Sequence, residues 1–177
     1  MANNCFNWIQ VYGSDLTKAQ ELIREAIKRN NEGYGWLPEG FEHRDGYIHY
    51  LFDLDDIVMD NGGISFQCWT KWSPPIEELK GLAKMCEGTE WRCQYEESGM
   101  QLYGRLVIKD GEVVSHIFID DNDMKRIEQD AEYNVYFDGE LVDSESVAVE
   151  EMLDEKEMGI RYNKLKTEGS VSNAEAQ

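Results

Sequence analysis

The chain has 177 residues and a formal net charge of −19, with 41% hydrophobic and 11% aromatic residues. That apolar content supports a real core, which excludes wholesale disorder, so we expect one folded domain with an appendage or two very small domains. A chain with so large a negative charge repels nucleic acid and anionic lipid, and it attracts basic protein surfaces. No secretion-signal pattern and no stretch near the roughly 18–20 apolar residues of a membrane span is present, so we expect a soluble, cytoplasmic protein.

The predicted elements begin with a strand and a helix. Residues 4–12 alternate in the manner of a strand with apolar groups on both faces, and residues 16–30 carry apolar side chains at helical spacing. Residues 46–59 predict a second strand. The turn formers at 60–63 then predict a hairpin into a return strand over 64–69.

A second helix and three more strands follow. Ser73, as an N-cap before two prolines, predicts the start of a helix that ends at Gly88. Alternating apolar residues predict a strand over 91–95 and a hairpin over 102–119, with its turn at 109–112.

This order of elements predicts the fold class. Strand, helix, strand, strand, helix, strand is the order of the split βαβ, or ferredoxin-like, fold. We therefore predict an α+β ferredoxin-like split βαβ sandwich with an added β-hairpin over residues 1–119. An acidic C-terminal subdomain over 120–160 and a disordered tail over 161–177 follow.

The acidic subdomain holds most of the negative charge. Residues 120–157 contain 15 acidic residues against three basic ones, a net charge of −12. The pattern indicates a short helix over 123–132, a small hairpin within 133–142 and a helix over 144–156. Apolar residues are interspersed among the acidic ones, so we expect part of the charge to lie on a folded surface. A folded surface loses less conformational entropy on binding a partner than a flexible tail does.

Several short motifs resemble one family. The matching residues are Asn4-Cys5 with Asn7, Trp69, Trp72-Ser73-Pro74-Pro75, Tyr95-Glu96-Glu97, Gly99 and Gly104. Over roughly residues 1–104 the chain resembles a family of phage- and plasmid-borne proteins with a ferredoxin-like domain, the Api-like proteins, named after a protein of an aphid-symbiont phage. The resemblance implies a ferredoxin-like fold and a mobile-element setting, and it assigns no catalytic residues.

Two aspartate patterns suggest cation sites. Asp53, Asp55 and Asp56 form a D-x-D-D cluster with Asp60, and paired aspartates on one strand face hold Mg²⁺ in nucleotide-acting enzymes. No Gly-Ser turn precedes them, and a solvated strand end that runs into a hairpin is the simpler interpretation. Residues 121–132 have the length of a calcium loop but lack its glycine, which excludes a true EF-hand.

The cysteines and histidines form no catalytic signature. The four cysteines, Cys5, Cys68, Cys86 and Cys93, contain no CxxC pair, so we expect free buried thiols. A zinc site from Cys68, Cys86 and Cys93 with His43, His49 or His116 is the alternative. No nucleophile elbow or phosphate-binding loop is present. We therefore predict no cofactor, no metal and no catalytic residue.

The tryptophans offer a possible binding surface. Trp8, Trp36, Trp69, Trp72 and Trp91 would build a base-stacking platform on an open sheet face if basic residues surrounded them. The net charge of −19 argues against that platform. We expect most of these rings to lie in the core or to seal the sheet, and a protein-docking patch is the alternative.

These observations leave the function open among three classes. The acidic block is either a solubilising surface or a DNA mimic that binds a basic surface of a host protein, as an anti-CRISPR or anti-restriction inhibitor would. The candidate partner-binding residues are Asp120, Asp121, Asp123, Glu150, Glu151, Asp154 and Glu155. The alternatives are a small metal-dependent nucleotide-acting enzyme that uses Asp53, Asp55 and Asp56, and a structural module of a mobile element that forms a homodimer through its tryptophan-rich face. We expect no direct nucleic-acid or membrane binding.

Overall fold

The computed structural model describes residues 4–32, 51–60 and 62–174, with the backbone alone for residues 30, 52 and 161–174. The chain divides into two compact units, Met1–His116 and Ile117–Gln177. This boundary lies three residues before the predicted one. Trp36, His43, His49 and the first part of the predicted strand over 46–59 lie outside the described residues.

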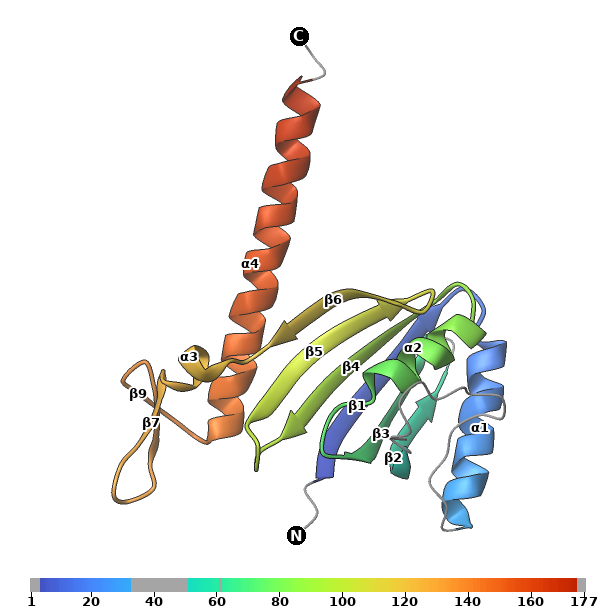
Figure 1. Ribbon diagram of the computed structural model, residues 1–177, viewed down its shortest axis with the longest axis horizontal. Helices are drawn as coiled ribbons and strands as arrows, with labels where there is room; N and C mark the ends of the chain where they lie inside the picture. Colours follow the sequence, from blue (N-terminus) through green and yellow to red (C-terminus); the bar gives the residue numbers. More distant parts are fainter. Residues whose placement is uncertain (1–3, 33–50, 61, 175–177) are drawn as a thin grey trace. The chain divides into compact units, whose positions relative to one another are not determined.

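The first unit is a six-stranded antiparallel sheet with two helices (Figure 1). Its elements are β1 (Asn4–Gly13), α1 (Thr17–Asn31), β2 (Phe52–Met59), β3 (Ile64–Lys71), α2 (Ile76–Met85), β4 (Thr89–Glu97), β5 (Leu102–Lys109) and β6 (Glu112–Phe118), whose last two residues belong to the second unit. The strand order is β2-β3-β1-β4-β5-β6. The first four strands have the ferredoxin-like arrangement and β5 with β6 extends the sheet, which confirms the predicted fold class.

Both helices cover the same face of this sheet, as Figure 1 shows. Alternate strand residues on that face are fully buried, among them Ile9, Phe66 and Trp91. The inner stripe of α2, which includes Leu79 and Leu82, packs into the same core. The other sheet face has no helix of this unit on it, so its aromatic side chains face away from the core.

A buried polar contact joins one end of the β1–β3 ladder to the loop before α2. The Asn7 side chain is fully buried, and its Nδ2 donates to Cys5 O at 3.0 Å and to Thr70 Oγ1 at 2.9 Å. The Thr70 hydroxyl in turn donates to Ser73 O at 2.8 Å. Asn7 therefore satisfies buried groups that would otherwise cost about 1–3 kcal/mol each.

The start of α2 corrects the predicted N-cap. The cap residue is Pro75, and the first helical bond runs from Leu79 N to Pro75 O at 2.9 Å. Ser73 lies in a turn instead, because its amide donates to Lys71 O and its carbonyl accepts from Thr70. Trp72, with a φ of 73°, sets the direction of that turn.

The second unit contains short elements and one long helix. They are α3 (Asp121–Met124), β7 (Ile127–Gln129), β8 (Val135–Phe137), β9 (Glu140–Val142) and α4 (Glu145–Ala174), with the strand order β7-β8-β9. The small hairpin within 133–142 is confirmed. The predicted helix over 123–132 is wrong, because the helix ends at Met124 and β7 follows it.

Helix α4 is longer than the sequence pattern indicates. It continues to Ala174, through most of the segment predicted as a disordered tail. Residues 161–174 are mostly polar or small and carry no continuous apolar stripe, and such a stripe is the signal by which an amphipathic helix is recognised in a sequence.

Candidate protein-binding surface on the acidic unit

The acidic unit begins with a capping box on α3. Asp120 Oδ1 accepts from Asn122 N at 2.7 Å and from Asp123 N at 3.1 Å, and Asp123 Oδ2 accepts from Asp120 N at 2.8 Å. This arrangement satisfies amide groups that the helix itself leaves unpaired. The backbone bonds from Asp123 and Asn122 lower the pKa of Asp120. The side chains of Asp120 and Asp123 therefore stabilise the N-terminus of α3.

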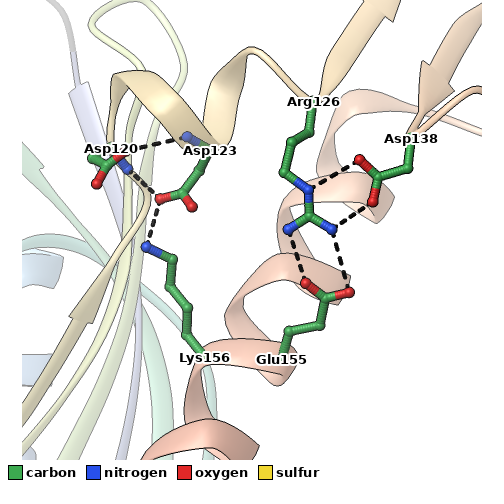
Figure 2. A network of polar contacts seen from close by, with 6 residues as sticks. All are labelled: Asp120, Asp123, Arg126, Asp138, Glu155 and Lys156. Carbon is green, nitrogen blue, oxygen red and sulfur yellow. Dashed lines mark hydrogen bonds and ion pairs between the residues drawn. The ribbon is translucent and has the colours of Figure 1, made fainter.

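Arg126 joins three segments of this unit (Figure 2). Its guanidinium donates from Nε to Asp138 Oδ1 at 3.0 Å and from Nη1 to Glu155 Oε2 at 2.8 Å. It also lies over the Phe137 ring, 4.6 Å from the centroid. Two-pronged bonds of this kind fix geometry as well as charge. The Arg126 side chain therefore ties the end of β8 to α4 and lowers the pKa of Asp138.

The other basic residues near the network are also engaged. Lys156 pairs with Asp123, whose side chain is only 16% exposed, and Lys125 Nζ donates to Asn122 Oδ1 at 2.9 Å. Within residues 117–160, whose side chains the structure describes, Lys125, Arg126 and Lys156 are the only Lys and Arg side chains. All three make contacts inside the unit.

Helix α4 is anchored by its own apolar residues. Ala148, Val149, Met152 and Leu153 are buried. The carboxylates of the same helix are left on its outer side, and Glu150, Glu151, Asp154 and Glu155 are exposed. The acidic residues are thus displayed on a packed helix.

A turn between β7 and β8 uses one more carboxylate. Asp130 accepts from the amides of Glu132 and Asn134, both at 2.9 Å, and from the Tyr136 hydroxyl at 3.2 Å. These bonds, with that from the Asn134 side chain as the largest contribution, lower the pKa of Asp130. Asp130 therefore stabilises the turn by which β7 pairs with β8.

The structure thus divides the seven candidate binding residues into groups. Asp120, Asp123 and Glu155 have internal partners, whereas Asp121 and Glu151 are exposed, with no side-chain hydrogen bond or ion pair in the part of the chain that is described. Glu150 and Asp154 are exposed and each takes part in a further interaction. Sequence reasoning missed the roles of Arg126 and Lys156. Only the Asp120–Asp123 spacing, which suits a capping box, was a local signal.

The acidic unit is expected to lose stability in acid. The folded-state pKa values of Asp120, Asp130 and Asp138 lie below the ordinary one, so their contribution is present above about pH 4 and is lost as the pH falls through the folded values. NMR titration of the Asp138 carboxyl should give a low pKa, and Arg126→Gln should raise it toward about 3.9. Lys125→Gln, which removes a neighbouring charge that donates to Asn122, is the control. An Asp138 pKa unchanged by Arg126→Gln would contradict this assignment.

The aspartates of β2 lie on an irregular stretch of strand. Two register shifts against β3 flank Asp55, and Asp53 and Asp56 have positive φ values of 49° and 48°. These bulges remove the strict alternation that would place Asp53 and Asp55 on one face. Asp60 caps its own turn by accepting from Gly62 N at 2.7 Å. Among the described residues, no three His, Cys, Asp or Glu side chains form a group that could hold a metal ion.

The thiols are free and buried, as the sequence predicts. Burial raises the pKa of Cys86 to about 11 and that of Cys68 further, so these sulfurs are poor ligands and nucleophiles. His116 lies elsewhere, with its Nε2 at 2.9 Å from the Tyr95 hydroxyl. The described residues therefore bring together neither the zinc site nor a catalytic triad.

Comparison with known proteins identifies the family of the chain. The family described as "Ferredoxin-like domain in Api92-like protein" matches residues 49–138, and the chain belongs to this family. The suspected resemblance is confirmed. No curated protein and no solved structure matches the chain. No helix among the described residues has both the length and the apolar character of a membrane span.

Proposed function

We propose that this member of the Api92-like family is a non-enzymatic accessory protein whose acidic unit binds a basic surface of a host protein in the cytoplasm. The observation that carries the proposal is the folded display of carboxylates on the unit Ile117–Gln177. This unit has 17 acidic and six basic residues, a net charge of −11. Three of those bases, including Arg126 and Lys156, are already engaged within the unit.

Preorganisation is what distinguishes this surface from an acidic tail. The capping box, the Arg126 network and the buried apolar stripe of α4 fix the backbone from which the carboxylates project. A fixed array loses less entropy on binding than a flexible one. Complementary charge also speeds association and selects the partner.

The charge density of α4 supports a nucleic-acid mimic as the finer form of the proposal. Residues 145–157 carry six carboxylates. Thirteen helical residues rise about 18 Å, which gives one carboxylate per roughly 3 Å. One DNA strand carries a charge per about 3.4 Å, so α4 alone approaches the density of a single strand. The partner of such a surface is a protein with a cationic nucleic-acid channel, as in a restriction or CRISPR nuclease.

Capture from host lysate tests the proposal. The tagged full chain should retain one or a few basic proteins at 50 mM salt and release them at higher salt, because ionic contacts between exposed charges are screened. Mass spectrometry identifies the retained protein. A partner that binds equally at both salt concentrations, or no partner at all, would contradict the proposal.

Competition with duplex DNA separates mimicry from other acidic contacts. If the acidic unit occupies a DNA channel, a short duplex should displace the full chain from the captured protein. If the captured protein binds the chain and the duplex at the same time, the acidic unit contacts it outside the DNA channel, and mimicry is excluded.

A further inference from the structure

The helix-free face of the first unit is lined with aromatic side chains. The β1 residues on this face are Phe6, Trp8, Gln10 and Tyr12, and Trp69 on β3 lies opposite Phe6. Trp8 is 41% exposed, Trp69 36% and Tyr12 36%. Of the four tryptophans that the structure describes, Trp91 is buried, whereas Trp8, Trp69 and Trp72 are exposed.

The face also differs from the rest of the chain in charge. On β3, β1, β4 and β5 the residues that share it, by strand register, include four basic and two acidic ones: Lys71, Arg92, Arg105 and Lys109 against Glu90 and Glu96. Asp55 of β2, opposite Gln67, reduces the sum to +1. A face with a positive net charge is unexpected in a chain whose formal net charge is −19. The net charge of the whole chain therefore does not describe the charge of this face.

Amide side chains lie between the aromatic rings. In one row across the sheet, Gln67, Trp8 and Gln94 stand side by side on β3, β1 and β4. In the next row Gln10 faces Ser65. Glutamine amides both donate and accept, so those of Gln67 and Gln10 match the hydrogen-bonding edges of nucleobases, whereas Gln94 Oε1 already accepts from Arg105 Nε at 3.0 Å.

An open pocket of about 440 Å³ lies at one end of the same face. Its lining residues are Tyr12, Gly13, Gly88, Glu90, Arg92 and Lys109. Arg92 lies over the Tyr12 ring, 5.2 Å from its centroid, and is held there by Glu90 at 2.7 Å. The pocket thus offers a flat ring, a guanidinium plane and the ammonium group of Lys109 to one ligand.

We propose that this face binds single-stranded nucleic acid. Exposed rings on a sheet stack bases without regard to sequence, and flanking cations contact the phosphates. Trp8 and Tyr12 are about 13 Å apart along β1, so they would receive different nucleotides. The proposal concerns the first unit alone and goes beyond the protein contact of the acidic unit.

Fluorescence anisotropy with labelled twelve-residue oligo(dT) and oligo(U) tests this assignment on the full chain at 150 mM salt. Binding of either probe supports it, and the ratio of the two affinities shows whether DNA or RNA is preferred. Trp8→Ala and Trp69→Ala should each weaken binding by about 5- to 150-fold, the effect of losing one stacked base. Tyr133→Ala, which removes an exposed ring from the acidic unit, is the matched control and should bind as the wild type does.

The salt dependence gives a second readout. Lys109→Gln should lower the slope of log affinity against log salt by about one, whereas Lys28→Gln, on the exposed side of α1, should not. Failure of both probes to bind, or full affinity in Trp8→Ala, would overturn the proposal. So would a dimeric wild type that Trp8→Ala converts to a monomer without either form binding a probe, because the face would then join two copies. None of these outcomes bears on the acidic unit.

Discussion

Neutralising four exposed carboxylates of the acidic unit is expected to weaken its complex with the captured host protein by roughly 10- to 100-fold. The variant is Asp121→Asn, Glu128→Gln, Glu132→Gln and Glu151→Gln. All four residues are exposed, and within the described part of the chain none has a side-chain hydrogen bond or ion pair, so the fold should be retained. Each exposed charge contributes about 0.2–1 kcal/mol to such a contact. Surface plasmon resonance measures the change, which should lie largely in the association rate.

A control with the same net charge separates local from overall electrostatics. Glu25→Gln, Glu32→Gln, Glu87→Gln and Glu112→Gln are exposed positions of the first unit, and their neutralisation changes the total charge equally. This control should bind nearly as the wild type does. If both variants weaken binding equally, the contact depends on total charge and the acidic unit has no special role.

Removal of the Asn7 side chain is expected to cost the first unit about 2–4 kcal/mol of folding free energy. Asn7→Ala removes the hydrogen bonds that Asn7 Nδ2 donates to Thr70 Oγ1 and to Cys5 O in the core, and it opens a small cavity. The midpoint of thermal unfolding should fall by roughly 8–15 °C. All five tryptophans lie in the first unit, so their fluorescence follows its unfolding selectively.

Two further variants show whether Asn7 acts through Thr70. Gln10→Ala, on the same strand but on the helix-free face, should change stability by no more than about 0.5 kcal/mol. Thr70→Val combined with Asn7→Ala should give a coupling free energy of about 1 kcal/mol in a double-mutant cycle. Additive effects would mean that Asn7 stabilises the unit without the bond to Thr70.

The fold of the first unit was predictable because its signals are local. Residues 64–69 alternate, Asp60 accepts from the amides of Gly62 and Gly63 before β3, and the core stripe of α2 has helical spacing. The bulges at Asp53 and Asp56 carry no such signal, because aspartate fits both extended and positive-φ backbone and so does not by itself indicate a bulge. The position of the α2 cap depends on the turn at Trp72, which a two-proline motif does not reveal.

The candidate surface was predictable in charge but not in arrangement. Arg126 contacts Asp138 and Glu155, which are 12 and 29 residues away, so no short spacing could indicate the network. The exposure of Trp8 and Trp69 likewise depends on which sheet face the helices cover. Alternation in a strand shows two faces but does not say which of them is buried.

Amide hydrogen exchange of the full chain, alone and with the captured partner, locates the contact directly. If the acidic unit is folded before binding and forms the interface, α4 should show protection in the free chain. The partner should then slow exchange further over Asp121–Met124 and the α4 turns that contain Glu150 and Glu151. Protection by the partner confined to Met1–His116 would contradict the account, because the acidic unit would then lie outside the interface.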